Sequence, residues 1–235
     1  MRALSDLIDT TEMYLKTVFE LEEEGIPALR ARIVERLGQS GPTVSETVAR
    51  LERDRLLAVG EDRQIRFSEL GLERAADVMR RHRLAECLLK DVIGIDWPQL
   101  HDEACRWEHV ISDEVAEKIS GILGNPTQDP FGNPIPRAGA RGVVLADPAT
   151  AGLVSLAELD LDGGAKTSTV KRLSEVIQVD SDVLAELLTA GIVPGAEVTV
   201  ISSGPNGVVV AVASEGEKPQ VTVAVGTAKH IYVAA

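Results

Sequence analysis

A stretch rich in proline, asparagine and glycine, residues 125–136, divides the sequence into two parts of different character. Before this stretch, apolar residues recur every three or four positions, which is the spacing of helices that bury one face. After Asp147, short runs alternate between apolar and polar residues, and Gly- and Pro-rich turns separate them, as in a series of strands. A chain of 235 residues is long enough for two or three small domains with separate cores. We therefore expect helical domains followed by a small β domain.

The first part of the chain predicts three helices followed by a small hairpin. A tight break, Gly38-Gln-Ser-Gly41, precedes the third helix, and Pro42 suits the first position of that helix. This order of helices and hairpin predicts a winged helix-turn-helix. The expected helices cover residues 5–24, 28–37 and 42–56, and the expected strands cover residues 57–59 and 64–67.

The third helix has an apolar face and a polar face. Val44, Val48 and Leu51 fall on one narrow face, which should pack inward. The surrounding segment 27–67 holds eight arginines, six acidic residues and no lysine, so any contact with DNA is expected there. An ordinary solvated helix face has a similar pattern, and it is the whole order of helices and hairpin that favours DNA recognition. The residues on the polar face are Thr43, Glu46, Ala49, Arg50 and Arg53.

The remaining patterns predict more helices and then a small β-barrel. A long helix is expected from Glu69 to Val92, and helical segments resume near Gln99 and extend to Leu123. The short strands of the last part have the length and spacing of a small barrel. Its expected helix covers residues 181–190, and its expected strands cover residues 197–201, 207–212, 220–224 and 230–233.

Residues that can bind a transition metal are concentrated in one window of the chain. Three of the four histidines and both cysteines lie between His82 and His109. On a helix, positions i, i+4, i+7 and i+8 share one face, and a histidine, a cysteine, a glutamate and a second histidine follow at this spacing. These four residues are His101, Cys105, Glu108 and His109. His82 and Glu86 form a second pair, at i and i+4, on the preceding helix.

The mixture of imidazole, thiolate and carboxylate donors suits Fe(II), Co(II), Ni(II) or Zn(II), whereas Mg²⁺ and Ca²⁺ would require oxygen donors. The alternative is a hydrogen-bonded contact between two helices, but several donor types at helical spacing favour a metal site. Cys87 lies among leucines beside Glu86 and is expected to be a buried structural thiol.

Composition restricts the class of protein further. The net charge of −13 argues against a general polyanion binder. No apolar run approaches the roughly 20 residues of a membrane span, and the N-terminus lacks the apolar stretch of a signal peptide. Two cysteines in a chain of this size are expected as thiols or metal ligands rather than as a disulfide framework. We therefore expect a cytoplasmic protein without a membrane partner.

Five segments carry more specific motifs. The most specific is His101-Asp-Glu-Ala-Cys-Arg-Trp-Glu-His109. The others are Asp9-Thr-Thr-Glu-Met13-Tyr-Leu, Leu29-Arg-Ala-Arg-Ile33, Gln39-Ser-Gly-Pro-Thr-Val-Ser45 and Pro130-Phe-Gly-Asn-Pro-Ile-Pro136. Together they resemble the iron-dependent repressors of the diphtheria toxin repressor family. The resemblance covers the first 136 residues closely and the rest of the chain loosely.

The resemblance implies a mainly α fold with small β parts in three domains. These are a winged helix-turn-helix over residues 1–75, a helical dimerisation and metal-binding domain with a Pro-rich linker over residues 76–142, and an SH3-like β-barrel over residues 147–235. It also implies two metal sites in each subunit, with an anion near the second metal. The primary site would use Met13, Cys105, Glu108 and His109. The ancillary site would use His82, Glu86, His101, Glu175 and Gln178, and the anion would be held by Arg83 and Asn133.

The function that the resemblance implies is an iron(II)-activated transcriptional repressor of iron-uptake and iron-homeostasis genes, and not an enzyme. Fe²⁺ would be the co-repressor, and Co²⁺, Ni²⁺, Mn²⁺ or Zn²⁺ could replace it in vitro. The homodimer would bind a palindromic operator in double-stranded DNA, with two dimers on each operator. The expected DNA contacts are Arg30, Ser40, Pro42, Thr43, Ser45, Glu46, Arg50 and Arg63.

Two residues depart from the family pattern. Glu46 stands in the recognition helix where iron regulators of this family usually have glutamine. Its carboxylate is repelled by phosphates but can accept a hydrogen bond from cytosine N4, so the preferred operator can differ. Asp129 stands where the family often has serine at the anion site, which puts anion binding there in doubt.

Three alternatives stay open on the sequence. A manganese-responsive regulator of the same family is the nearest, although the soft donors Met13 and Cys105 favour Fe(II) over Mn(II). A metalloenzyme would need a general base, for which Glu103 or Glu114 could be nominated, but no substrate motif accompanies them. In a third reading, the C-terminal barrel binds a proline-rich ligand, and the chain's own segment 130–136 is the obvious candidate.

Overall fold

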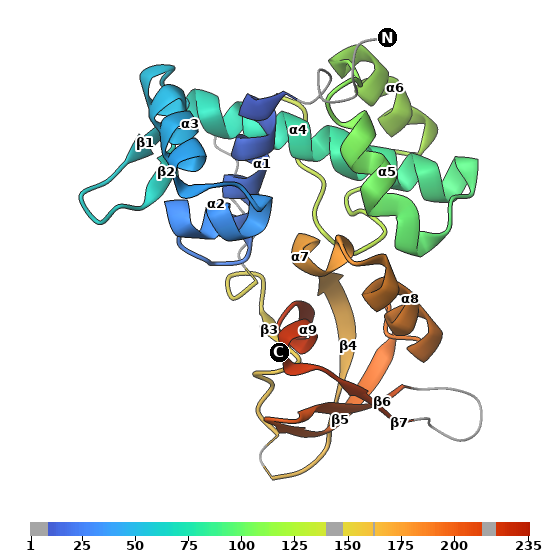
Figure 1. The fold of residues 1–235 in the computed structure, drawn as a ribbon. Coiled ribbons are helices and arrows are strands. Elements are labelled where there is room, and N and C mark those ends of the chain that lie inside the picture. The colour runs from blue at the N-terminus through green and yellow to red at the C-terminus, as the bar shows by residue number, and fades with distance from the viewer. Residues whose placement is uncertain (1–8, 140–147, 162, 213–219) are drawn as a thin grey trace. The chain divides into compact units, whose positions relative to one another are not determined.

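The structure is a computed structural model that describes residues 9–139, 148–161, 163–212 and 220–235 (Figure 1). The chain forms two compact units. Unit 1 contains residues 1–85, 104–127 and 135–147, and unit 2 contains residues 86–103, 128–134 and 148–235. Both units therefore combine segments that are distant in the sequence, and each is described by itself below.

Unit 1 begins with the predicted winged helix-turn-helix (Figure 1). Helix α1 covers Thr10–Glu23, α2 covers Arg30–Leu37 and α3 covers Gly41–Arg53. The hairpin consists of β1 (Leu57–Val59) and β2 (Ile65–Phe67), which pair antiparallel. Apolar residues from all five elements form one buried core with the start of the next helix. The core includes Tyr14, Leu15, Val18, Phe19, Ile33, Val44, Val48, Leu51, Leu57, Ile65 and Met79.

Local sequence explains where α3 begins and which face it buries. Gly38 adopts the left-handed conformation that ends α2, and the Ser40 side chain accepts a hydrogen bond from the backbone N–H of Thr43. Val44, Val48 and Leu51 are fully buried, as their spacing predicts.

The helical segment after the hairpin differs from the prediction in two places. Helix α4 (Glu69–Leu88) passes into a π-helical turn, η2 (Leu89–Ile93), which Gly94 ends in the left-handed conformation. The helical pattern from 99 to 123 contains two helices, α5 (Leu100–Trp107) and α6 (Asp113–Ile122). They are separate because Ser112 caps α6 by accepting a hydrogen bond from Val115 N–H. Glu108 and His109 therefore lie in the turn after α5.

Unit 2 is built on a six-stranded antiparallel sheet with the order β3-β8-β4-β5-β6-β7. The four predicted strands and the helix at 181–190 are all present. Two further strands were not predicted, because β3 is short and the polar sequence of β4 resembles a loop. The strands are β3 (Leu153–Ser155), β4 (Lys166–Leu173), β5 (Glu197–Gly204), β6 (Gly207–Val212), β7 (Gln220–Val223) and β8 (Ile231–Ala234). The helices after β4 are α7 (Glu175–Gln178), α8 (Ser181–Ala190) and α9 (Val225–Ala228).

The proline-rich stretch does more than link two domains. Residues 128–134 belong to unit 2, where they lie against the end of β4. Leu173 N–H donates to the carbonyl of Phe131 at 2.8 Å, and the Asn133 amide donates to the carbonyl of Leu173 at 3.1 Å. The Phe131 ring is fully buried, and its centroid lies 4.8 Å from that of Trp97. Residues 128–134 are therefore packed against β4 within unit 2, a contact that the sequence pattern did not predict.

In the part of the chain that the structure describes, no helix combines the length and apolar character needed to cross a bilayer.

Gly132 is expected to be essential for this docked segment. Its φ is +85°, and a Cβ built there would lie 2.0 Å from the backbone carbonyl oxygen of Lys171, which cannot rotate away. We expect Gly132→Ala to lower the free energy of unfolding by about 1–3 kcal/mol or more, as measured by urea denaturation. Gly94→Ala is the matched control, because Gly94 has a φ of +82° with open space around its Cβ position. Equal losses in both variants would contradict a specific clash at Gly132.

Candidate metal centre

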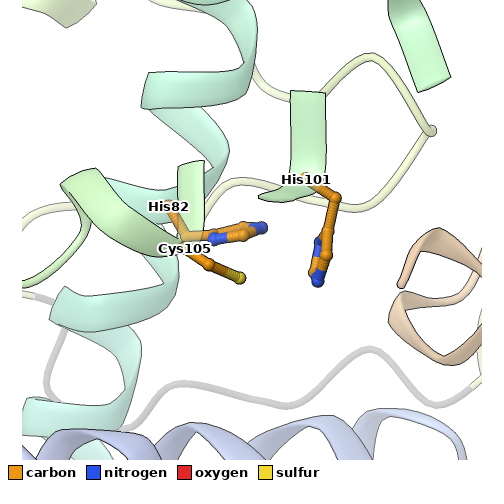
Figure 2. Close-up of side chains that lie close together, drawn as sticks. All are labelled: His82, His101 and Cys105. Carbon is orange, nitrogen blue, oxygen red and sulfur yellow. The ribbon is translucent and has the colours of Figure 1, made fainter. Parts of the chain in front are cut away.

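One face of α1 lies against the segment that contains the predicted primary ligands, and Lys16 is at the centre of that contact. The Lys16 Nζ atom lies 2.8 Å from Glu108 Oε2, 3.1 Å from His82 Nδ1 and 3.5 Å from Cys105 Sγ. Figure 2 shows the side chains of His82, on α4, and Cys105, on α5. A potential ligand atom of each of these two residues lies within 4.8 Å of the other. The structure thus brings an ammonium group among a thiol, an imidazole and a carboxylate.

Burial and charge fix the ionisation of Glu108. Its side chain is only 4% exposed, and burial alone would raise its pKa. The ammonium of Lys16 and the hydrogen-bonded ring of His82, 2.6 Å away, outweigh burial and lower the pKa of Glu108 to about 2. Glu108 is therefore an ionised carboxylate at neutral pH, because the ammonium of Lys16 and the ring of His82 stabilise its negative charge.

His109 is oriented by two carboxylates. Its Nδ1 atom lies 2.7 Å from Glu12 Oε2 on α1, and its Nε2 atom lies 3.3 Å from Glu108 Oε1. Arg81 fixes this arrangement from α4, because its guanidinium donates to Glu12 Oε1 at 2.7 Å and to the carbonyl of Glu108 at 2.8 Å. Met13 lies on α1 beside Glu12 and is partly buried against the core of unit 1.

A second cluster lies within unit 2. Ligand atoms of Glu86, His101 and Glu175 all lie within 4.8 Å of one another, and all three residues are at least nine-tenths buried. The His101 Nδ1 atom is 3.3 Å from Glu175 Oε2 and 3.6 Å from Glu86 Oε1. His82 precedes Glu86 by one turn of α4 and so projects from the same face of that helix.

Gln178, the fifth residue expected at the ancillary site, lies on α7 with Glu175. Its amide nitrogen donates to the carbonyl of Leu173 at 2.9 Å, which fixes the orientation of the amide. The Oε1 atom is buried and accepts no hydrogen bond within the described residues. An unsatisfied carbonyl oxygen in the same unit as two buried carboxylates and an imidazole fits a divalent cation, because a buried oxygen that accepts no hydrogen bond is costly and a cation would satisfy it. The chemistry of the donor set thus matches a metal site.

The two residues expected to hold an anion already have internal partners. Arg83 is fully buried and pairs with Glu23, to which it donates two hydrogen bonds within unit 1. In unit 2, the Asn133 amide donates to Asp129 at 3.0 Å and accepts from Arg172 Nε at 2.6 Å. The carboxylate of Asp129 also accepts the backbone N–H groups of residues 131 and 133. Asp129 thus supplies a negative charge of its own beside Asn133, and anion binding there stays a prediction.

The predicted DNA-contacting residues lie on the winged helix-turn-helix. Ser40, Pro42, Thr43, Ser45 and Glu46 are exposed at the start of α3. The other predicted contacts are Arg50, half-buried on α3, Arg30, at the start of α2, and Arg63, exposed in the hairpin turn.

Helix α1 also contacts the helix-turn-helix directly, on a different face from the ligand cluster. The Tyr14 hydroxyl donates to Gln39 Oε1 at 2.5 Å, just before α3, and Arg50 donates to Thr11 Oγ1 at 3.3 Å. A single helix therefore touches both the potential metal ligands and the helix expected to read DNA.

Glu12 and Lys16 were missed in the sequence. Lysine is not a metal ligand at neutral pH, and a glutamate in the first turn of a helix is common. Their spacing of i and i+4, which places both on the face of α1 that includes Met13, is the signal that could have identified them.

A winged helix-turn-helix joined to helices with buried metal-binding clusters defines a metal-responsive DNA-binding protein. Family models match almost the whole chain: "Iron dependent repressor, N-terminal DNA binding domain" over residues 6–65, "Iron dependent repressor, metal binding and dimerisation domain" over residues 68–137, and "Diphteria toxin repressor SH3 domain" over residues 156–225. The chain belongs to the diphtheria toxin repressor family of iron-dependent repressors.

Similar proteins support this assignment over most of the chain. The iron-dependent repressor IdeR of Mycobacterium tuberculosis is 51% identical over 210 residues, which is 89% of this chain and 91% of the relative. The diphtheria toxin repressor of Corynebacterium diphtheriae is 50% identical over 198 residues, covering 84% of this chain and 87% of the relative. A solved structure described as a manganese-dependent transcriptional repressor in complex with manganese has a TM-score of 0.82 at 29% identity, covering 96% of this chain and all of the other.

The buried pair of Arg83 and Glu23 is expected to stabilise unit 1 strongly. Glu23→Gln leaves the fully buried guanidinium without its carboxylate, and we expect a loss of about 3–5 kcal/mol in the free energy of unfolding. Glu35→Gln is the matched control, because Glu35 pairs with Arg32 at the surface and should contribute less than about 1 kcal/mol. Urea denaturation followed by circular dichroism measures both. A loss below about 1 kcal/mol for Glu23→Gln would contradict this assignment.

Proposed function

We propose that this protein is an iron(II)-activated transcriptional repressor in which α1 couples a metal site to DNA binding. The observation that carries the proposal is the position of α1 in unit 1. One face contacts Glu108, His109 and Cys105, and the other contacts Gln39 and Arg50. The names of the curated relatives, at 50–51% identity, support repression in response to iron and not enzymatic activity.

Four residues would hold the ion at the primary site: Met13, Cys105, Glu108 and His109. Three of them come from the segment 105–109, and Met13 comes from α1. When bound, a divalent ion supplies positive charge and coordinate bonds that join these side chains. The ancillary site would use His82, Glu86, His101, Glu175 and Gln178, in agreement with their buried oxygen and nitrogen donors.

Coupling follows from the two sets of contacts that α1 makes. If Met13 and residues 105–109 held one ion, α1 would keep a fixed position relative to α5. The Tyr14–Gln39 and Arg50–Thr11 hydrogen bonds would then fix a residue just before α3 and the last turn of α3 relative to α1. In a homodimer, this would set the spacing of the two recognition helices, so that metal and a palindromic operator raise each other's affinity by the same factor.

The identity of the metal rests on the soft donors. A thioether and a thiolate favour Fe(II) over Mn(II), because manganese sites prefer carboxylate, imidazole and water. Manganese is the second candidate, since the solved structure at 29% identity is described as manganese-dependent.

The DNA interface would be the exposed face of α3 with the hairpin turn. Thr43 and Ser45 are small enough to let the helix enter the major groove, and Arg50 and Arg63 would supply the cationic contacts to phosphates or base edges. Glu46 is exposed and makes no hydrogen bond or ion pair within the described residues, so its carboxylate is available to accept from a base edge such as cytosine N4.

Replacing one soft ligand should remove metal-dependent DNA binding. Met13→Ala or Cys105→Ala is expected to abolish it while leaving circular dichroism and the dimer unchanged. Cys87→Ala is the matched control, since Cys87 is a buried thiol whose pKa burial raises to about 12, and it contacts the carbonyl of Gln128. Normal iron dependence in either ligand variant would show that the primary site is misassigned.

Glu12 is expected to orient His109 for metal binding. A histidine ligand whose other ring nitrogen is held by a carboxylate loses affinity by about ten- to a hundredfold when that carboxylate is removed. We therefore expect Glu12→Gln to weaken Co(II) binding by about that factor in a chelator competition. Glu114→Gln, on the exposed side of α6, is the control and should bind Co(II) as the wild type does. Unchanged affinity in Glu12→Gln would remove this role.

The direct test of the proposed function is operator binding under anaerobic conditions. An operator is first selected from random sequences in the presence of Fe(II), and its fluorescence anisotropy is then titrated with protein, without metal, with Fe(II) and with Mn(II). Tight binding only with Fe(II), reversed by a chelator, is the expected result. Equal activation by low concentrations of both metals would keep the metal-activated repressor but remove the case for iron, and no metal-dependent binding would overturn the proposal.

A further inference from the structure

We propose that Lys16 is a built-in competitor of the metal ion, whose ammonium group holds the ligand atoms of the primary site and must be displaced when a metal binds there. This inference rests on the proposed metal site and concerns how its affinity is set. Lys16 is not among the predicted ligands. It acts on the site through Glu108, Cys105 and His82, each of which lies within 3.5 Å of its Nζ atom.

The ammonium group of Lys16 contacts the same atoms that a metal ion would use. Its nearest contact is Glu108 Oε2, at 2.8 Å, and it donates to the sulfur of Cys105 at 3.5 Å. A metal ion at Glu108 and Cys105 would lie within a few ångströms of this ammonium. Two positive charges at that separation in a buried site repel each other strongly, so the two arrangements exclude one another.

The site is too deeply buried for water to solvate the carboxylate of Glu108 in place of Lys16. The side chain of Lys16 is 8% exposed and that of Glu108 is 4% exposed. A carboxylate at this depth needs a cationic or hydrogen-bonding partner, and Lys16 provides it. Metal binding therefore gains the coordination of Glu108 but loses the Lys16–Glu108 pair. The observed free energy of metal binding is the free energy of coordination reduced by that of the lost pair.

A second acidic side chain lies within reach of the ammonium on the same helix. Glu20 lies one turn further along α1, and its Oε1 atom is 3.9 Å from Lys16 Nζ. The ammonium can therefore leave Glu108 and keep an acidic partner on its own helix by a change of side-chain rotamer.

Replacement of Lys16 by a neutral residue that has no metal-ligating atom tests the inference. We expect Lys16→Leu to bind Co(II) at least about tenfold more tightly than the wild type in a chelator competition, because a charge-assisted hydrogen bond no longer has to be broken. The thiolate-to-Co(II) absorption band reports directly on Cys105. Lys118→Leu is the matched control, since Lys118 is exposed on α6, and it should leave Co(II) affinity unchanged. Lys16→Arg keeps the charge and should keep the weaker affinity.

Thermal unfolding gives a second, independent readout. Without added metal, Lys16→Leu should melt below the wild type, because Glu108 loses its ammonium partner, and saturating Co(II) should close this gap. If Lys16→Leu does not fold, Lys16→Ala, which also has no metal-ligating atom, takes its place in both measurements.

The outcomes separate this inference from the proposed function. If the wild type itself binds no Co(II), the proposed metal site is wrong and the inference fails with it. If the wild type binds Co(II) and the neutral variant binds it equally or more weakly, Lys16 does not compete, and the inference alone is overturned. Tighter binding by the neutral variant together with wild-type affinity in Lys16→Arg and Lys118→Leu establishes it.

Discussion

The buried carboxylate of Glu108 is the constraint on which the arrangement of unit 1 depends. A negative charge with an exposed fraction of 4% must be paired, and its partners here come from two helices: Lys16 on α1 and His82 on α4. The same electrostatic requirement therefore joins the turn after α5 to α1 and α4. It also explains why this place suits a metal ion, since a divalent cation satisfies the same charge with additional donors nearby.

Helix α1 converts this local requirement into a property of the DNA-binding domain. Its buried residues belong to the core of the winged helix-turn-helix, so α1 cannot shift without disturbing α2 and α3. Its polar residues face in two directions, with Glu12 and Lys16 toward residues 105–109 and Thr11 and Tyr14 toward the recognition helix. A change in the charge at the metal site therefore acts on α1, and through α1 on the recognition helix α3.

Much of this organisation could be predicted from the sequence, and the failures have physical reasons. The apolar spacing of Val44, Val48 and Leu51 predicted the buried face of α3, because helix geometry alone determines it. The docking of residues 128–134 on β4 depends on long-range hydrogen bonds that no local pattern contains. Glu175 and Gln178 were assigned through the family resemblance only, since they are some seventy residues from His101 in the sequence. Lys16 was missed because a lysine has no place in a ligand motif, and only the fold shows what it contacts.

The central claim, that α1 couples the metal site to DNA binding, is tested most directly by reciprocity. The Fe(II) affinity of the protein is measured anaerobically, once alone and once with a saturating concentration of its selected operator. The account predicts that the operator raises the Fe(II) affinity by the same factor by which Fe(II) raises the operator affinity. An Fe(II) affinity that does not change when the operator is bound would contradict it.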